Sequence, residues 1–330
     1  MFSLETICET PFKILFASTI SFLIVSISYK YIWLKLRNKV IVPQGVGGMF
    51  PLLITSALFY LSPESFLLAP LIILTLSALI YLYDDWFGLN PIYRSFLIIV
   101  TSIIICFLLL DIQKESITPA VIMILMFSAI FFSLVNLLNF YDGADLNVVT
   151  FIFLIGISIS TCAPDAIYGT ELGMILCGMA FGFGILNHRP ANLYFGDSGC
   201  FAVSGCLVIF LIINSDTIFQ SDIRIITPFI IPACDVSAVI IYRILKNENL
   251  LTRNFYHLYQ RIQIKFGRNW HILVQIVGFF SIITLFEFSK LFELSDWLSF
   301  FLASTIVLIC TFSITHFLTK PRLRKLGVKS

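Results

Sequence analysis

Apolar residues run through this chain in long blocks that are separated by short polar segments. About eleven blocks have the length expected of a membrane-spanning helix, for which roughly 20 mostly apolar residues suffice. The blocks lie at residues 12–33, 46–62, 66–83, 92–110, 118–138, 148–163, 170–187, 199–214, 225–245, 270–288 and 296–318. The pattern predicts an all-α polytopic membrane protein with about 11 transmembrane helices.

The composition supports a membrane protein and argues against a soluble domain. Hydrophobic residues make up 58% of the 330 residues and charged residues only 12%, and the mean hydropathy is +0.96. A soluble domain carries about 25% charged residues. No long polar stretch suggests a second domain, so we expect a single integral membrane domain over residues 1–330.

The basic residues predict the orientation of the chain, because cytoplasmic loops are enriched in Lys and Arg. When the connections are assigned alternately to the two sides, one side receives only Lys13, Lys114, Arg224 and Lys290, and the other receives 17 of the 21 basic residues. This division places the N-terminus outside and the C-terminus in the cytoplasm. The motif-bearing cytoplasmic loops are then about residues 35–48, 84–94, 136–147, 187–199 and 243–268.

Aspartates gather on this basic side. Its acidic residues are Asp84, Asp85, Asp142, Asp145, Asp197, Asp235 and Glu248. Ionisable groups at membrane depth are costly and usually functional. Because the aspartates lie at or near helix ends on a basic face, they suggest a site for a metal ion and phosphate groups.

The first aspartates occur in "YLYDDWFGLNPIYR", at the end of one predicted span. Asp84 and Asp85 are adjacent, so on a helix their side chains diverge by about 100° and face different ligands. Gly88 and Pro91 predict a turn, and Arg94 opens the next helix on the same side. The alternative interpretation is a solvated loop with ordinary charges at its ends.

The segment "NLLNFYDGADLN" follows the fifth predicted span. Asn136, Asn139 and Asp142 recur at i, i+3 and i+6, which places them on one face if the helix continues. Asp142 and Gly143 then break the helix, and Asp145 follows in the turn. Capping of the helix end by Asn and Asp explains one or two of these residues, but it does not explain the whole group.

The segment "NHRPANLYFGDSGC" has the most distinctive spacing in the chain. Asp197 stands near a predicted helix N-terminus among glycines. We expect backbone amides at this position to hold a phosphate while the carboxylate holds a cation.

A fourth polar group begins inside the ninth span, at Asp235, where structural and catalytic roles are equally open. In the following loop, His257 and Arg261 share a face at i, i+4 if the segment is helical. Anchoring at the membrane surface accounts for most of the Lys and Arg in this loop.

Together, these segments and "VPQGVGG" at 42–48 resemble the polyprenyl-phosphate N-acetylhexosamine-1-phosphate transferases. This is the glycosyltransferase 4, or phospho-MurNAc-pentapeptide translocase-like, family. The resemblance covers about residues 43–262, including the patterns "NxxNFxDGxD" and "NxxPAxxFxGDxGS". "HLYQR" at 257–261 is similar to the "HxYQR" branch, which initiates O-antigen chains with deoxy-amino sugars such as N-acetylfucosamine or N-acetylquinovosamine.

The resemblance implies an enzyme of the bacterial inner (cytoplasmic) membrane with its active site on the cytoplasmic face. Such enzymes transfer a sugar 1-phosphate from a UDP-sugar to undecaprenyl phosphate, release UMP, and thereby initiate O-antigen or other cell-surface polysaccharide synthesis. The implied cofactor is Mg²⁺, with Mn²⁺ as an alternative. The implied partners are a UDP-N-acetyl-amino sugar, undecaprenyl phosphate and membrane lipid, with a homodimer left open and no nucleic acid.

The resemblance also assigns roles to individual residues. Asp84 and Asp85 match the paired catalytic aspartates. Asp197 is implied to bind the metal ion, and Asn139 is the position we pair with it. Tyr194 matches the aromatic residue that stacks on uracil. The remaining substrate-binding candidates are Arg94, Asp142, Asp145, Asn187, His257 and Arg261.

Four positions depart from the pattern of the family. Leu146 stands where the family usually has Gly, and Cys200 replaces the usual Ser. Ile98 stands where many members carry a polar residue, and Asn254 replaces an acidic residue or His. The turn after Asp145 is therefore expected to differ in shape, while the metal site stays intact.

The chemistry itself does not require a strong base. A phosphomonoester has a second pKa of about 6, so it is largely ionised at pH 7. We therefore expect Asp84 and Asp85 to orient the lipid phosphate and the metal ion, and we expect a single displacement. A base role for either aspartate would need a raised pKa.

The main alternative is a multi-pass transporter with intramembrane aspartates. Transporters tend to place ionisable groups near the midplane, whereas only Asp235 is deep here. A non-catalytic scaffold protein is a second alternative, and it has no need for these ordered motifs.

Overall fold

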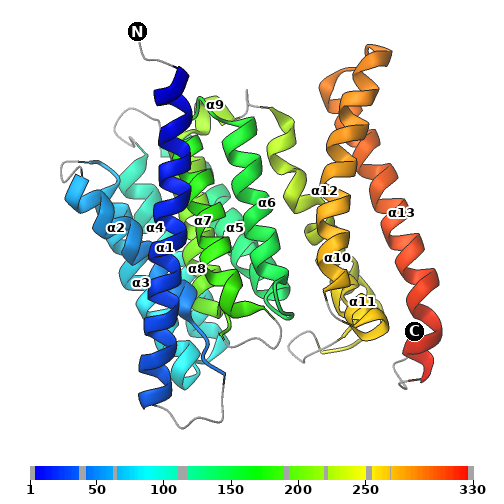
Figure 1. The fold of residues 1–330 in the computed structure, drawn as a ribbon, viewed down its shortest axis with the longest axis horizontal. Helices are drawn as coiled ribbons and strands as arrows, with labels where there is room; N and C mark the ends of the chain where they lie inside the picture. The colour runs from blue at the N-terminus through cyan, green and yellow to red at the C-terminus, as the bar shows by residue number, and fades with distance from the viewer. Residues whose placement is uncertain are drawn as a thin grey trace.

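The computed structural model describes residues 4–36, 42–61, 65–110, 117–188, 193–218, 222–249, 255–267 and 269–325. Parts of three predicted loops lie outside these ranges, including Arg189, Pro190 and Ala191 of the third motif and Asn254 before "YHLYQR". The described chain folds into α-helices and short 3-10 helices (Figure 1). Within the described residues, β-structure is limited to an isolated parallel bridge between Gln44 and Tyr194.

The α-helices follow the apolar blocks. They are α1 (Leu4–Leu36), α2 (Phe50–Leu61), α3 (Leu68–Phe87), α4 (Pro91–Leu109), α5 (Ile117–Tyr141), α6 (Asn147–Cys162), α7 (Gly169–Asn187), α8 (Asp197–Ile213), α9 (Ser215–Ile218), α10 (Thr227–Leu245), α11 (Leu258–Phe266), α12 (Trp270–Ser289) and α13 (Asp296–Lys325). The 3-10 helices are η1 (Val46–Met49), η2 (Ile223–Ile226) and η3 (Lys290–Phe292). Each of the predicted apolar blocks overlaps one of these α-helices.

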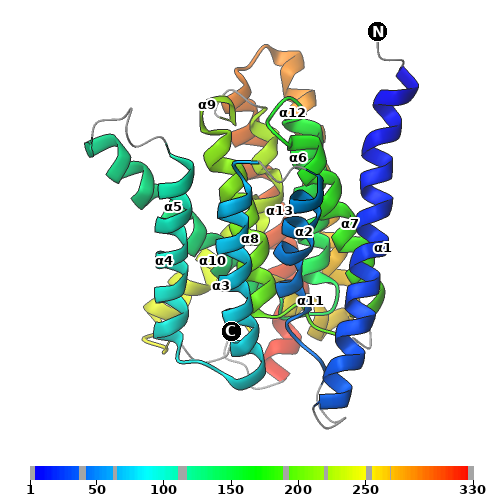
Figure 2. The ribbon, with the colours of Figure 1, turned by 90° about the vertical axis from the view of Figure 1, so that its left-hand side faces the viewer.

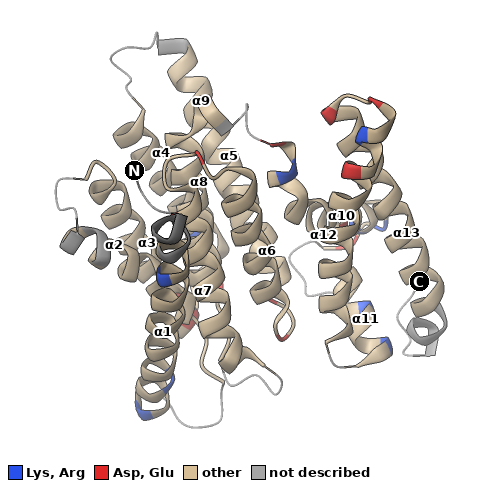
Figure 3. Cartoon of the chain, turned by 45° about the horizontal axis from the view of Figure 1, so that its top comes forward, with Lys and Arg blue, Asp and Glu red and all other residues tan. Residues whose placement is uncertain are grey.

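Among the described residues, eight helices are long and apolar enough to cross a membrane. Three apolar helices are shorter, at Val46–Ser56, Asn147–Cys162 and Asp197–Ile213. Charged side chains lie mainly near helix ends, and the middle parts of the helices are almost free of them (Figure 3). The described part of the chain is therefore helical, with several candidate membrane spans.

Helix α7 packs against α1 on one face and α6 on another, and small residues bring the backbones together. A Cβ atom added at Gly182 would lie 2.5 Å from the carbonyl oxygen of Thr19 in α1. A Cβ atom at Gly173 would lie 2.6 Å from the carbonyl oxygen of Gly156 in α6. Association of helices in a membrane relies on such close backbone contact, because the apolar side chains gain little by leaving lipid.

Helix α8 lies at the centre of the larger group of helices (Figure 2). It contacts α2, α3, α4 and α5. Nearly all its residues from Ser198 to Ile212 are buried. It packs against α3 and α5, where the ring of Phe201 stacks on that of Tyr81 with centroids 4.4 Å apart. Its first residue, Asp197, is therefore attached to the most enclosed helix of the bundle.

Helices α10 to α13 form a second packed group with an apolar cluster of its own, which includes Ile231, Ile282, Phe286 and Phe300. It lies on the side of the molecule opposite α1 in Figure 1. Polar contacts connect this group to the turn between α5 and α6. His271 Nε2 of α12 lies 3.0 Å from the carbonyl oxygen of Asp145.

The turn between α3 and α4 forms as the sequence predicts, but α3 is longer than expected. Helix α3 continues through Asp84 and Asp85 to Phe87 and ends at Gly88, which has a φ of +77°. Asn90 then caps α4, since its side chain accepts a hydrogen bond from the backbone N–H of Ile92 at 3.0 Å. Because both aspartates are helical, their side chains point in different directions.

Candidate active site

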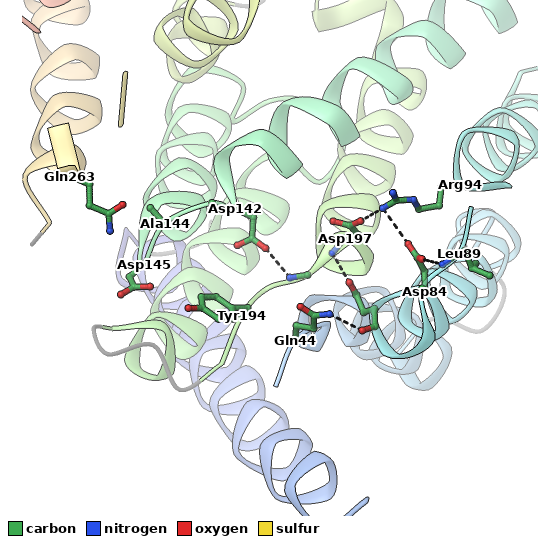
Figure 4. A pocket seen from close by; sticks show the side chains of 14 residues that line it. Gln44, Asp84, Leu89, Arg94, Asp142, Ala144, Asp145, Tyr194, Asp197 and Gln263 are labelled. Atoms are coloured by element: carbon green, nitrogen blue, oxygen red, sulfur yellow. Dashed lines mark hydrogen bonds and ion pairs between the residues drawn. The ribbon is translucent and has the colours of Figure 1, made fainter. Parts of the chain in front are cut away.

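A polar pocket of about 780 Å³ opens at one end of the helix bundle. Its lining residues are Gln44, Asp84, Asp85, Gly88, Leu89, Arg94, Asp142, Gly143, Ala144, Asp145, Tyr194, Gly196, Asp197 and Gln263. Figure 4 shows the side chains of these residues converging from several helices and loops. The volume lies within the range of about 300–1,000 Å³ that is usual for pockets that bind small molecules.

At one end of the pocket, an arginine joins two carboxylates. Arg94 at the start of α4 forms an ion pair with Asp197 at the start of α8, and its Nη1 lies 3.4 Å from Asp84 Oδ2 (Figure 4). The other oxygen of Asp84 accepts a hydrogen bond from the backbone N–H of Leu89. Asp84 thus fixes the turn and orients the arginine, while the carboxylate of Asp197 remains 36% exposed toward the pocket.

The first turn of α8 is bonded to carboxylates from two other segments. Asp85 Oδ1 accepts the N–H of Asp197 at 3.0 Å, and Asp85 Oδ2 accepts the N–H of Ser198 at 3.1 Å. Asp142 Oδ2 accepts the N–H of Gly196 at 3.0 Å. We predicted from the sequence that amides here hold a phosphate. That prediction is wrong for these three amides, because carboxylates already accept their hydrogen bonds.

Asp142 follows directly after α5 and lines the middle of the pocket. Desolvation raises the pKa of its carboxyl group to about 8. The N–H of Gly196 lowers this pKa, while the nearby carboxylates of Asp197 and Asp85 raise it further. A cation in the pocket would therefore be electrostatically favoured, because it would relieve the repulsion among these carboxylates.

The segment from Pro43 to Val46 runs beside the chain that leads into α8. The N–H of Gly45 donates to the carbonyl oxygen of Tyr194, and the N–H of Tyr194 donates to that of Pro43. The fit requires glycine, because a Cβ atom at Gly196 would lie 2.5 Å from the nitrogen of Gly45. This pairing places Gln44 and Tyr194 on the same wall of the pocket.

The turn between α5 and α6 contains the residue that departs from the family pattern. Leu146 has a φ of +61°, a left-handed conformation that glycine adopts without strain. Its N–H donates to Asn187 Oδ1 at 2.7 Å, and Asn187 Nδ2 donates to the carbonyl oxygen of Leu193 at 2.9 Å. Asn187 is buried and does not line the pocket, so it holds two pocket-forming segments together.

Asn139 lies in the last turns of α5 and outside the pocket lining. Its Oδ1 is buried, and it has no hydrogen-bond partner among the described residues. The residues that the structure describes include no group of three or more His, Cys, Asp or Glu side chains arranged for a metal ion. Mg²⁺ does not need such a group, because it is usually bound by one or two carboxylates together with substrate phosphates. Asp197 lines the pocket and could supply one such carboxylate, whereas Asn139 lies outside the lining.

His257 and Arg261 lie outside the pocket lining. His257 is buried, and its Nδ1 lies 3.4 Å from Asp235 Oδ2. Arg261 Nη2 donates to Thr319 Oγ1 of α13 at 2.7 Å. His257 precedes α11 as its N-cap residue, so the i, i+4 pair predicted on one helical face is split between a cap and a helix.

Gln263 of α11 and Gln44 line the pocket, and neither was a candidate residue in the sequence. Gln44 belongs to "VPQGVGG", whose similarity to a family loop was a signal for it. Gln263 had no comparable signal, because its position depends on how α11 packs against α12 and α13.

The fold and the pocket together define a polytopic membrane protein with a carboxylate-lined site at one end of its helices. Residues 67–215 match the sequence profile of glycosyl transferase family 4. This range covers less than half of the chain and includes Asp84, Arg94, Asp142 and Asp197. No curated protein matches the chain. This part of the chain is similar to a family of membrane glycosyl-phosphate transferases, in agreement with the resemblance found in the sequence. "HLYQR" at 257–261 lies outside the matched range.

Proposed function

We propose that this protein transfers a sugar 1-phosphate from a UDP-sugar to undecaprenyl phosphate and releases UMP. The observation that carries the proposal is the arrangement of Asp84, Arg94 and Asp197 around one pocket at the end of an apolar helix bundle. All three residues lie within the stretch that matches glycosyl transferase family 4. We place this pocket on the cytoplasmic face of the bacterial inner membrane, where the basic loops of the sequence are expected.

The reaction brings two anions together. An oxygen of the lipid phosphate attacks the β-phosphorus of the UDP-sugar, and the bond from that phosphorus to the bridging oxygen breaks as UMP leaves. Catalysis of phosphoryl transfer relies mostly on positioning and charge neutralisation. Arg94 supplies a positive charge at the end of the pocket where Asp84 and Asp197 meet. We assign Asp84 and Arg94 to orienting the lipid phosphate.

A divalent cation fits the oxygen ligands that remain at this site. Asp197 would hold Mg²⁺, with Asn139 as the second candidate ligand, and the ion would neutralise the diphosphate of the donor. Mn²⁺ is the alternative. We assign Asp142, Asp145 and Tyr194 to the donor nucleotide, with Tyr194 stacking on uracil. These residues line the pocket beyond the Arg94 end (Figure 4).

The donor is proposed to be a UDP-N-acetyl-amino sugar, and the pathway O-antigen or another cell-surface polysaccharide. This finer assignment rests on the likeness of "HLYQR" to the "HxYQR" branch. His257 and Arg261 lie behind the pocket walls, so we expect them to act on the substrate through the segments that they support. Tyr259 lies between them in the chain and connects this segment to the end of α5, because its hydroxyl donates to the carbonyl oxygen of Phe140 at 2.7 Å.

The proposal is tested by incubating purified protein with undecaprenyl phosphate, Mg²⁺ and a panel of UDP-sugars. Release of UMP that depends on both the lipid and Mg²⁺ is the expected result, and the donor that supports it identifies the sugar. Failure of every donor to yield UMP would reject the proposal. Movement of a solute across proteoliposomes without UMP release would favour the transporter.

A further inference from the structure

The start of α8 has an unusual form of capping. The first four backbone N–H groups of a helix have no partner within the helix. They are usually satisfied by a Ser, Thr, Asp or Asn side chain at the N-cap position. In α8 the N-cap residue is Gly196, which has no side chain to offer. The free N–H groups of the first turn must therefore find acceptors elsewhere.

Asp85 provides these acceptors from α3. Its two carboxylate oxygens accept the N–H groups of Asp197 and Ser198 at 3.0 and 3.1 Å. Ser198 Oγ also lies 2.6 Å from Asp85 Oδ2, closer than to its other acceptor, the carbonyl oxygen of Gly45 at 3.0 Å. A negative charge is favourable at this end of a helix, where the backbone dipoles leave a partial positive charge. Both oxygens of Asp85 are thus used in holding the first turn of α8.

The two adjacent aspartates, Asp84 and Asp85, therefore have different roles. Asp84 Oδ2 faces Arg94 at 3.4 Å, at the end of the pocket where that arginine meets Asp197. Asp85 instead holds the backbone of Asp197, whose side chain projects toward the pocket (Figure 4). The divergence of neighbouring residues on a helix separates these two directions by about 100°.

We propose that Asp85 is a positioning residue that fixes the Asp197 carboxylate by holding the first turn of α8, and that it does not contact the lipid phosphate. The inference rests on the proposed function, in which Asp197 holds the metal ion. Partners that orient a metal ligand matter for affinity, and their loss typically weakens metal binding or activity by about 10- to 100-fold. Asp85→Asn keeps the size of the side chain but removes the charge and one of the two acceptors.

The first test needs no substrate. Hydrogen exchange by mass spectrometry is followed over residues 193–205 in the parent and in Asp85→Asn. First-turn amides exchange quickly unless a side chain accepts from them, so their protection depends on Asp85. We expect exchange at residues 197 and 198 to become at least about tenfold faster, with residues 87–90 unchanged. Unchanged exchange at 197 and 198 would overturn the proposal.

The second test separates positioning from direct contact with the lipid. For Asp85→Asn, the Mg²⁺ concentration that gives half-maximal activity should rise by about 10- to 100-fold. The KM for undecaprenyl phosphate should change by less than about threefold, since uniform loss of lipid binding would appear there. A raised KM for the lipid with an unchanged Mg²⁺ requirement would show that Asp85 touches the lipid phosphate, and it would overturn the proposal.

Two further variants distinguish the proposal from a simple folding defect. They are Ser198→Ala and the double variant that combines it with Asp85→Asn. Ser198→Ala should shift the Mg²⁺ requirement in the same direction by a smaller factor. The double variant should be no worse than Asp85→Asn, because the hydroxyl acts through that carboxylate, whereas independent sites would add. Additive losses would contradict the proposal. If Asp85→Asn does not fold, Ser198→Ala alone decides, and an unchanged Mg²⁺ requirement in it would overturn the proposal.

A matched control is available at another helix start. Asp222 accepts the backbone N–H of Arg224 at 2.9 Å at the beginning of η2 and does not line the pocket. Asp222→Asn should leave the Mg²⁺ requirement unchanged. If the parent protein releases no UMP with any donor, the proposed function fails. The exchange measurement, which needs no substrate, still decides whether Asp85 holds α8.

Discussion

Asp85 and Asp235 each hold the start of a helix other than their own. Asp85 of α3 accepts the amides of Asp197 and Ser198 in α8, and Asp235 of α10 accepts the amide of Leu258 in α11 at 2.8 Å. Both use the same physical device, because the first amides of a helix lack internal partners. The two regions, the start of α8 and the start of α11, differ in which side chain the capped helix contributes to the pocket.

The helix held by Asp85 begins with Asp197, whose side chain itself enters the pocket. The helix held by Asp235 sends Gln263 to the pocket more than one turn later. Its early residues support other parts of the protein, as Tyr259 does at the end of α5. The same contact is thus expected to control metal binding in one region and mainly stability in the other.

The largest effect is expected for Asp197→Asn, which removes the carboxylate that the Asp85 contact positions. UMP release in ordinary Mg²⁺ should fall by about 100-fold or more, because one charged ligand and the partner of Arg94 are lost together. Asp216→Asn in α9, away from the pocket lining, is the matched control. Activity near the parent level would refute the metal role of Asp197.

Asp235→Asn sharpens the comparison from the other side. Asp235 is buried, and its oxygens face His257 and the amide of Leu258. Disturbing such buried polar contacts should lower the free energy of unfolding by about 1–3 kcal/mol. The change is measured as a lower melting temperature in detergent, with the Mg²⁺ requirement within about twofold of the parent. A large change in the Mg²⁺ requirement would remove the distinction between the two regions.

A smaller effect concerns the pH dependence of the metal-free protein. The folded-state pKa of Asp142 is raised to about 8, whereas an unperturbed Asp titrates near about 3.9. Ionising it in the fold is unfavourable, so stability should fall as the pH rises from about 4 to about 8 and then level off. Asp142→Asn should flatten part of this decline, measured as melting temperature against pH in EDTA. An identical slope in the variant would argue against this raised pKa.

The smallest effect is expected at Leu146, in the turn next to Asp145. Its φ of +61° is strained for leucine, and its partly buried side chain packs against the core. Leu146→Gly relieves the strain and loses the packing, whereas Leu146→Ala loses the packing alone. The Gly variant should therefore be more stable than the Ala variant by about 1 kcal/mol. Equal melting temperatures of the two variants would contradict this account.

The sequence predicted the helices well, because spans in a membrane need long apolar runs with internally satisfied backbones. It also predicted the break after α5 and the contribution of Asp84, Arg94 and Asp197 to one site. Helix ends were less accurate, since α8 begins at Asp197 and not at residue 199. That earlier start depends on an acceptor in α3, which no local pattern in the sequence of α8 reveals.

The positions of His257 and Asn187 could not be predicted for a related reason. Both are polar residues in motif segments, and polar residues there can face either the pocket or another backbone. Asn187 bonds the amide of Leu146 and the carbonyl of Leu193, and His257 faces Asp235. Only the packed structure distinguishes a side chain that supports the wall of a pocket from one that contacts its contents.

The capping of α8 also bears on how the protein is made. Asp85 and the amide of Asp197 are 112 residues apart in the chain, and Asp142 and the amide of Gly196 are 54 apart. Such long-range contacts form late, because distant segments must be brought together before the contact is made. During synthesis, α3 and α5 are completed long before α8 emerges. The pocket therefore arises at a late step of assembly, and Mg²⁺ binding would report that the membrane helices have docked in their final order.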